Sequence, residues 1–464
     1  MTDPIPLREY ERMKRQQTAE DADPRPSEFS DDALARHFAD EQQHRLRFVE
    51  PWGRWYIWNG TVWKTDDSLE ALDIARAICR ERAAKCGSER IAAAVLSAKT
   101  IAATERLAKT DRRIAATVDQ WDACQWTINT PAGVIDLRTG QTSPHEATRY
   151  CTKQTAVGPG GDCPTWDRFL YRVTAGDDQL QAFLQRMAGY ALTGDTSAHA
   201  LFFVYGTGGN GKSVFIDTVA SVIGDYAKTA PIETFTATNG DRHPTDLAGL
   251  RGARLVMAIE TEEGRRWAES RIKSLTGGDR ISARFMRQDF FEFTPQFKLL
   301  IAGNHKPGLR SVDEAIRRRF HLVPFTVTIP PDERDPHLKD KLRAEWPGIL
   351  AWAVRGCLDW QETGLRPPQA VLDATATYLE AEDAFAAWIE ECCEVDSIAW
   401  ESSSALYGSW RVWAETAGEF VGSAKRFGQA LETRGYLPMR TKAARGYGGL
   451  RLQTPPVRDW SEPR

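Results

Sequence analysis

A glycine-rich run that ends in lysine and serine is the most specific chemical signal in the sequence. Residues 206–213 read Gly-Thr-Gly-Gly-Asn-Gly-Lys-Ser and fit the G-x-x-x-x-G-K-[ST] pattern. In such loops glycines let backbone N–H groups curl around phosphate oxygens, the lysine pairs with the β- and γ-phosphates, and the serine ligates Mg²⁺. We therefore predict a site for ATP and Mg²⁺. Its residues are Gly206, Thr207, Gly208, Gly209, Asn210, Gly211, Lys212 and Ser213.

An acidic element follows the next apolar run. The segment Ile259-Glu260-Thr261-Glu262-Glu263 places two carboxylates two positions apart, so both side chains lie on one face if the chain is extended. A nucleoside triphosphatase needs one carboxylate near Mg²⁺ and another that orients the attacking water. We predict that Glu260 is catalytic and a metal ligand, that Glu262 is catalytic, and that Glu263 is a surface charge. The alternative is that all three glutamates only begin a helix.

An asparagine stands at the tip of a third apolar run, Ile301-Ala302-Gly303-Asn304. A polar side chain beside the strand that leads into the phosphate-binding loop can contact the γ-phosphate and the attacking water. Asn304 is therefore predicted to be catalytic. Taken alone, it is equally consistent with an ordinary turn residue.

A run of three arginines occupies residues 317–319. An arginine beyond the sheet can reach the nucleotide of a neighbouring subunit as an arginine finger. Three successive residues cannot share one face, so at most two serve the site. We predict Arg318 as the catalytic arginine and Arg319 as the second choice. The alternative is a basic helix end paired with Asp313 and Glu314.

These side chains need a buried sheet to position them. Continuous apolar runs over residues 201–205, 254–259 and 297–302 are typical of strands covered on both faces of a mostly parallel sheet. Residues 214–223 are expected to form the helix after the phosphate-binding loop, and its N-terminus adds a positive dipole end. The pattern predicts an α/β fold class with a P-loop ATPase core.

Composition limits the class of protein. The chain has 464 residues, of which 42% are hydrophobic and 27% charged, as in soluble globular proteins of about three domains. No apolar run approaches the ~20 residues of a membrane helix, and residues 1–26 lack the apolar segment of a secretory signal. We expect a cytoplasmic protein without a membrane partner. The eight cysteines include no C-x-x-C pair and are expected to be reduced.

The net charge of −4 does not indicate a nucleic-acid partner. Individual segments of the sequence do indicate one. Taken together, residues 206–213, 254–263, 274–284, 298–307 and 313–325 resemble superfamily 3 helicases, specifically the phage and plasmid primase–helicase family typified by satellite-phage replication proteins and the poxvirus primase–helicase. The run SLTGGDRISARFMRQDFFEF carries much of this resemblance, because generic P-loop proteins lack it.

The resemblance implies an AAA+-type ATPase core, a hexameric ring, hydrolysis of Mg·ATP and 3′-to-5′ movement on single-stranded DNA. It also implies a role in replicating a phage, plasmid or other mobile element in a bacterial host cytosol. The expected organisation is a flexible tail (residues 1–30), an α+β N-terminal collar (31–160), the ATPase core with preceding helices (161–328), a helical linker (329–383), a winged-helix-like domain (384–453) and a tail (454–464).

Local patterns give more detail at both ends of the chain. Aromatic and β-branched residues flank Asn59-Gly60, which predicts a hairpin. Residues 69–118 are rich in Ala, Arg and Glu and are expected to form two helices. Residues 384–453 are expected to form two or three helices and a small β-wing.

Two segments are candidates for DNA contact. The family resemblance places a DNA-gripping hairpin at residues 283–291, where Arg284 and Arg287 can neutralise phosphates and Phe285 can pack or stack. In the winged-helix-like domain, basic residues can contact a groove and the backbone. These are Lys425, Arg426, Arg440, Lys442 and Arg445. The alternatives are an ordinary hairpin with solvated arginines, and a solvated or protein-docking face.

The long members of the family carry a polymerase-type primase domain that is not recognised here. We expect this chain to make no primers, because Asp122 and Asp136 do not form a two-metal cluster and Asp21-x-Asp23 lies on a polar tail. The N-terminal region would instead help assemble the ring or recruit a separate primase. Two other functions stay open: an origin-binding initiator ATPase that melts DNA without processive unwinding, and a defence or scaffold ATPase without a DNA role.

Overall fold

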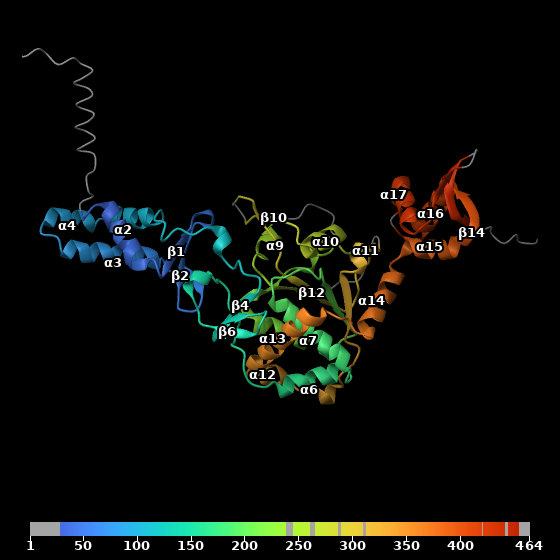
Figure 1. Ribbon diagram of the computed structural model, residues 1–464, viewed down its shortest axis with the longest axis horizontal. Coiled ribbons are helices and arrows are strands. Elements are labelled where there is room, and N and C mark those ends of the chain that lie inside the picture. Colours follow the sequence, from blue (N-terminus) through green and yellow to red (C-terminus); the bar gives the residue numbers. More distant parts are fainter. Residues whose placement is uncertain are drawn as a thin grey trace, which may run out of the picture. The chain divides into compact units, whose positions relative to one another are not determined.

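The computed structural model describes residues 28–237, 245–259, 265–285, 289–309, 312–419, 421–440 and 444–453. The chain forms two compact units. The first contains residues up to Asp136 together with Gln141–Gly158, and the second contains Leu137–Gly140 and the chain from Pro159 (Figure 1). Several predicted positions lie outside the described residues: Asp21, Asp23, Glu260, Glu262, Glu263, Arg287 and Lys442.

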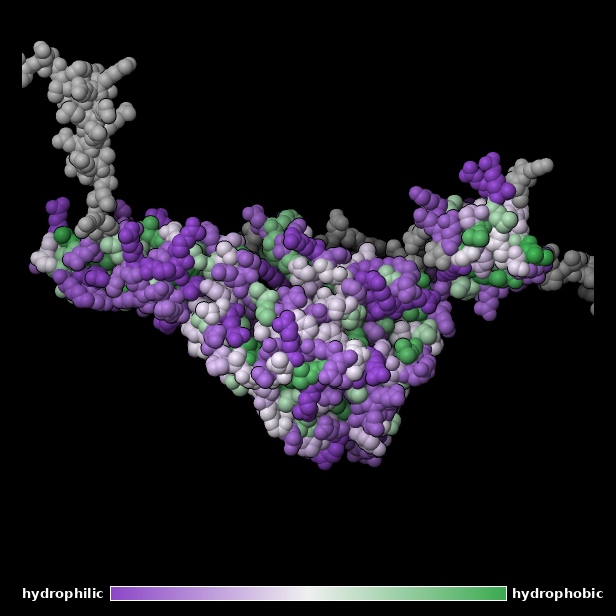
Figure 2. Space-filling view, in the orientation of Figure 1, coloured by the Kyte–Doolittle hydropathy of each residue, from purple (hydrophilic) through white to green (hydrophobic). Residues whose placement is uncertain are grey.

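Within the described part of the N-terminal unit, four helices pack together. They are α2 (Asp31–Gln42), α3 (Glu70–Ala84), α4 (Glu89–Val95) and α5 (Ala98–Ala108). Their inner faces bury Phe38, Ile78 and Val95, whereas their visible outer faces are largely hydrophilic (Figure 2), as expected for amphipathic helices. The prediction of two helices over residues 69–118 is wrong, because three form there. Helix α3 ends at Ala84, and residues 85–88 separate it from α4. Helix α5 begins after Ser97, whose side chain accepts a hydrogen bond from the Thr100 N–H.

Two antiparallel sheets complete this unit. The first has β1 (Leu46–Val49), β2 (Arg54–Trp58) and β3 (Trp63–Thr65) in that order. The predicted hairpin at Asn59-Gly60 is confirmed. The Asn59 side chain accepts hydrogen bonds from the Thr61 and Val62 amides, and Gly60 has a φ of 98°. The second sheet has β4 (Thr127–Thr130), β5 (Gly133–Asp136) and β6 (Gln141–Ser143).

A five-stranded parallel sheet forms the centre of the second unit. Its spatial order is β13-β7-β12-β9-β8. The strands are β7 (Leu201–Tyr205), β8 (Ala227–Thr229), β9 (Leu255–Ile259), β12 (Lys298–Gly303) and β13 (Phe320–Pro324). The three apolar runs identified in the sequence are therefore strands β7, β9 and β12, and the predicted α/β class with a parallel sheet is confirmed.

Helices cover both faces of this sheet, which explains why its strands are apolar throughout (Figure 1). Phe202 and Leu300 face Met187 and Val219 on one side, where α7 and α8 pack with α13, and α6 stacks Trp166 on Phe215 of α8. Neighbouring strand residues face the other side, where α10, α11 and α14 pack. The bounds are α6 (Pro164–Val173), α7 (Asp178–Leu192), α8 (Lys212–Ile223), α10 (Glu269–Gly277), α11 (Glu314–Arg317), α13 (Trp346–Thr363) and α14 (Gln369–Ala381).

A buried lysine joins this sheet to the end of α7. Lys298 begins β12, and its ammonium group donates to the carbonyl oxygens of Thr193 and Asp195 and lies 4.4 Å from the Tyr190 ring centroid. Burial lowers the pKa of Lys298 well below its usual value. The lysine satisfies carbonyls at a helix C-terminus, which is a favourable place for a cation.

The remaining elements of the second unit are short or lie at its C-terminal end. They are α9 (Thr245–Ala248), β10 (Ile281–Ala283), β11 (Phe291–Phe293), α12 (Leu338–Ala344), α15 (Ala384–Cys392), β14 (Cys393–Ser402), α16 (Ser403–Ala417), α17 (Ala424–Thr433), β15 (Pro438–Arg440) and β16 (Arg445–Leu452). The last six elements form a C-terminal domain, in which three helices and a β14-β16-β15 sheet surround Trp388, Trp410 and Phe427. This order agrees with the helices and small β-wing expected for residues 384–453.

Candidate functional site

The glycine-rich loop connects β7 to α8, as its sequence pattern requires. Gly206 has a φ of 158° and lies so close to β13 that an added Cβ would be 2.1 Å from the Phe325 carbonyl oxygen. Gly211 has a φ of 84°, and its Cβ would be 2.6 Å from Val173 of α6. Both positions therefore accept only glycine without rearrangement. Asn210 fixes the loop, because its side-chain amide donates to the Phe325 carbonyl at 2.7 Å.

Lys212 is the first residue of α8, directly after the glycine-rich loop, and it contacts the predicted asparagine. Its ammonium group donates to the Gly206 carbonyl at 2.5 Å, to Asn210 Oδ1 at 3.3 Å and to Asn304 Oδ1 at 3.2 Å. The last contact is possible because β12 pairs with β7 in parallel, with Gly303 opposite Tyr205. Burial lowers the pKa of Lys212. The structure thus brings together two residues that the sequence proposed for one site.

The other predicted donors lie around this contact. Ser213 is exposed in the first turn of α8, and Thr207 is exposed in the loop. Strand β9 pairs with β12 so that Ile259 is opposite Ala302, and Glu260 is the next residue in sequence. Glu260 and Glu262 themselves lie outside the described residues. An exposed serine hydroxyl next to a buried lysine at a helix N-terminus fits a phosphate group with a hard cation such as Mg²⁺.

The three arginines of residues 317–319 have three different environments. Arg317 lies 3.6 Å from Asp383. Arg319 is 5% exposed, and its guanidinium donates to Thr276 Oγ1 at 3.0 Å and to the Ala315 carbonyl at 2.7 Å. Arg318 is exposed. The geometry therefore favours Arg318 over Arg319 as an arginine that reaches outside its own subunit.

The predicted DNA-gripping segment is an antiparallel hairpin with an aromatic and basic loop. Strands β10 and β11 pair with Ala283 opposite Phe291. The Arg284 guanidinium lies 4.7 Å from the Phe290 ring centroid, and Phe285 stacks on Phe291 at 5.7 Å. Phe285 and Phe290 are 42% and 57% exposed. Arg284 and two exposed rings are thus grouped on one loop.

The basic residues near the C-terminus separate into two groups. Arg440 and Arg445 are directly opposite each other on β15 and β16, and both are exposed. Lys425 is exposed on α17; Arg426 is also in α17, but its side chain is outside the described residues. By contrast, Arg434 and Arg451 bond to Asp383 and Glu394. Among the described residues, Arg440 and Arg445 are thus two exposed arginines beside the turn of the β15–β16 hairpin.

Arg334 lies near the predicted nucleotide site, although no predicted site residue or motif includes it. Arg334 donates to the Ile329 carbonyl at 2.9 Å, and the Ile329 amide donates to the Gly209 carbonyl at 2.8 Å. A Cβ on Gly209 would lie 2.5 Å from the Arg334 guanidinium. No motif contains Arg334, so only the folded chain identifies it.

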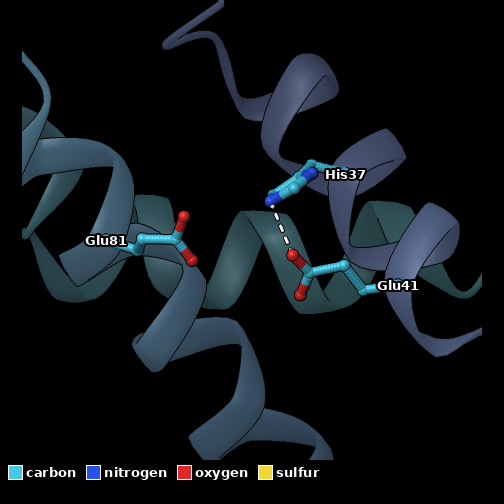
Figure 3. A group of neighbouring side chains, drawn as sticks. All are labelled: His37, Glu41 and Glu81. Carbon is cyan, nitrogen blue, oxygen red and sulfur yellow. Dashed lines mark ion pairs between the residues drawn. The ribbon is translucent and has the colours of Figure 1, made fainter.

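A possible metal cluster in the N-terminal unit is better explained as surface ion pairs. His37, Glu41 and Glu81 place one ligand atom each within 4.8 Å of one another (Figure 3). His37 is 3.0 Å from Glu41, four residues away on α2, and Glu81 pairs with Lys85, four residues away on α3. Glu41 and Glu81 are exposed. Such pairs are common on helices without a metal.

Asp122 and Asp136 lie in two different local structures. Asp122 has a φ of 49° and accepts hydrogen bonds from the Thr152 amide and hydroxyl, so its carboxylate links two segments that are 30 residues apart. Asp136 ends β5 opposite Thr127 of β4.

Among the described residues, no helix is long and apolar enough to cross a membrane.

Two protein-family models match the chain. One, described as D5 N terminal like, matches residues 34–175, and the other, described as a family of unknown function (DUF5906), matches residues 204–319. The second match contains the phosphate-binding loop, Asn304 and the arginine run.

Viral putative helicases are similar to more than half of the chain. The putative helicase of Frog virus 3 (isolate Goorha) is 27% identical over 261 residues, which cover 51% of this chain and 26% of that protein. A putative helicase of Acanthamoeba polyphaga mimivirus is 24% identical over 289 residues, which cover 57% of this chain and 30% of that protein. The chain thus spans less than a third of the length of these relatives.

Among solved structures, two apo forms of the NrS-1 C-terminal region are similar to this chain at 9% identity. One has a TM-score of 0.47 and covers 88% of each chain. The other has a TM-score of 0.45 and covers 87% of this chain and 95% of that chain.

Proposed function

We propose that this chain is a primase–helicase family member that works as an ATP-dependent DNA helicase. The observation that carries the proposal is the hydrogen bond of 3.2 Å between Lys212, at the end of the phosphate-binding loop, and Asn304, which follows β12. The residue that neutralises phosphate charge and the residue that can contact the γ-phosphate share one point at the carboxyl edge of the sheet. This edge is where ligands bind in open α/β sheets.

ATP hydrolysis follows from the roles of the residues around this point. The loop amides and Lys212 would bind the phosphates, Ser213 and Glu260 would hold Mg²⁺, and Glu262 would orient the attacking water. Bound Mg²⁺ would neutralise charge that develops between the β- and γ-phosphates. Asn304 lies close enough to Lys212 to contact the same phosphate.

We further propose an AAA+-type core that assembles into a ring, most simply a hexamer. The strand order β13-β7-β12-β9-β8 supports this class, because the phosphate-binding strand lies between the strand of Asn304 and the strand that follows the arginine run. Arg318 is exposed, whereas Arg319 is held inside its own subunit. Arg318 therefore completes the site of a neighbouring subunit.

DNA contact is assigned to two surfaces. The β10–β11 hairpin presents Arg284 and two exposed phenylalanines to single-stranded DNA, where aromatic rings stack on bases and cations neutralise phosphates. A winged-helix-like C-terminal domain presents Arg440 and Arg445. The protein would move 3′ to 5′ and serve replication of a mobile element in a bacterial cytosol, with a separate primase as a further partner.

The decisive experiment measures ATP turnover by the purified chain with and without single-stranded DNA, together with strand displacement on duplexes of increasing length. A helicase shows DNA-stimulated turnover and unwinds long duplexes, and Lys212→Ala does neither. Turnover that is unaffected by DNA contradicts the proposal and favours a scaffold or defence ATPase. The basic β15–β16 hairpin gives some support to an origin-binding initiator, which would open short duplexes only.

A further inference from the structure

Asp383 is a buried carboxylate at the junction between α14 and α15. It is 8% exposed. One oxygen accepts hydrogen bonds from the Ala386 amide at 3.2 Å and from the Arg434 guanidinium at 2.5 Å. The other oxygen lies 3.6 Å from the Arg317 guanidinium. A single buried negative charge is therefore shared by two arginines that are far apart in sequence.

The two arginines belong to different parts of the second unit. Arg317 is the last residue of α11 and directly precedes Arg318. Arg434 follows α17, and its guanidinium lies 4.6 Å from the ring centroid of Phe385. Phe385 packs on Trp388 and Phe427 in the C-terminal core. Asp383 consequently connects the helix that leads into Arg318 to the C-terminal domain.

Two residues that precede Asp383 in sequence, Tyr378 and Glu382, form hydrogen bonds with the loop that follows Asn304. Glu382 accepts a hydrogen bond from the Leu309 amide at 2.7 Å, and Tyr378 donates to the Pro307 carbonyl. Burial raises the pKa of Glu382. The end of α14 thus contacts both the asparagine loop and, through Asp383, the arginine helix.

Resting on the proposed function, we infer that Asp383 is a positioning residue that couples the C-terminal domain to the ATPase site. Neither arginine can leave Asp383 without weakening the pairing of a buried charge, which is costly. A displacement of the C-terminal domain by DNA therefore moves Arg317, and with it Arg318, rather than leaving α11 in place. The coupling acts on turnover and not on the binding of DNA.

The test separates the charge of Asp383 from its role as a helix cap. Asp383→Asn keeps the cap of α15, because asparagine and aspartate cap equally well, but it removes the charge. Arg317→Gln and Arg434→Gln each remove one partner. The matched control is Asp373→Asn, an exposed α14 aspartate that accepts from Gln369.

We expect stimulation of ATP turnover by single-stranded DNA to fall at least about fivefold in each of the three variants, a typical coupling between sites. Basal turnover and DNA affinity stay near wild type, and the Asp373→Asn control keeps its stimulation. The double variant Asp383→Asn, Arg317→Gln should be no worse than either single variant, because both break one link. Normal stimulation in Asp383→Asn contradicts the coupling.

Hydrogen exchange provides a second measurement, which tests the coupling even if the proposed helicase function is wrong. If the wild-type chain shows no DNA-stimulated turnover, the helicase assignment fails. Hydrogen exchange at the Ile316 and Arg317 amides then tests the link alone. Faster exchange in Asp383→Asn and in Arg434→Gln supports it, because loss of a contact in the C-terminal domain would then loosen α11. Unchanged exchange in both variants overturns it.

Discussion

Lys212 and Asn304 are 92 residues apart in sequence, yet the lysine ammonium group donates a hydrogen bond of 3.2 Å to the asparagine side-chain oxygen. Two parallel neighbours, β7 and β12, produce this contact, because the loop of one and the tip of the other meet at the same edge of the sheet. The pair gives the nucleotide site a polar centre that both strands maintain.

Removing either member of this pair should affect turnover more than folding. We expect Lys212→Ala to abolish ATP turnover and Asn304→Ala to lower kcat by about 10²-fold, as when one stabilising polar group is lost from a reacting site. Circular dichroism and the thermal unfolding midpoint should stay close to wild type. Near-normal hydrolysis by folded Lys212→Ala would remove the site assignment.

Alanine substitution should affect ATP hydrolysis at Arg318 and the stability of the fold at Arg319. Arg318→Ala should lose hydrolysis with an unchanged unfolding midpoint, because its side chain is exposed. Arg319→Ala should destabilise the fold by about 1–3 kcal/mol, because the Thr276 hydroxyl and the Ala315 carbonyl lose their partner. Mixed assemblies of Arg318→Ala and Lys212→Ala subunits should recover some turnover. Absence of recovery would place Arg318 at the site of its own subunit.

The hairpin arginines should contribute to DNA affinity without regard to sequence. The double variant Arg284→Ala, Arg287→Ala should lower the slope of log Kd against log salt by about 1.4, which is 0.7 for each phosphate contact on single strands. Basal ATP turnover should be retained. The control is Arg280→Ala on the same hairpin, where the arginine faces Glu292 at 3.7 Å. An unchanged slope in the double variant would move the contact to the C-terminal arginines.

The opposed pair Arg440 and Arg445 should show a trade between stability and binding. Like charges directly opposite on antiparallel strands repel each other, so Arg440→Gln should raise stability by roughly 0.2–1 kcal/mol. The same variant should weaken DNA binding. Arg451→Gln, which removes an arginine already paired with Glu394, should leave DNA binding unchanged. Equal effects of the two variants on affinity would argue against a specific role for the hairpin tip.

His321 should make the stability of the second unit depend on pH. It stacks on Phe202 at 5.4 Å, and burial lowers its pKa to about 4 from 6.5. Between these values the unfolded chain binds a proton that the folded chain does not, so stability falls as pH drops from 6.5 towards 4. The total loss is roughly 3 kcal/mol. Unfolding of His321→Gln over this range should lack that part of the dependence, and an identical profile would contradict the assignment.

Local sequence patterns were sufficient to predict the part of the candidate site that lies at strand ends and in the loops that follow them. The phosphate-binding loop, its helix and the position of Asn304 follow from apolar runs and from the geometry of parallel strands. The environments of Arg319, Arg334 and Asp383 could not be predicted in this way. Each of these environments includes at least one residue that is 43 or more positions away, such as Thr276 for Arg319, and no pattern of neighbouring residues encodes such a partner. The helices of residues 69–118 were miscounted because their breaks are short.

The strand order has a consequence for how the protein is made. Among the described strands, β7 pairs with β12 and β13, which are both synthesised much later. At a typical rate of ribosomal elongation, β12 follows β7 by roughly 5–20 s. During that interval an apolar strand has neither edge paired, and unpaired edges of this kind promote association between nascent chains. Release of the chain before Lys298, where β12 begins, would make this condition permanent, so such early termination should yield aggregates rather than a smaller folded ATPase.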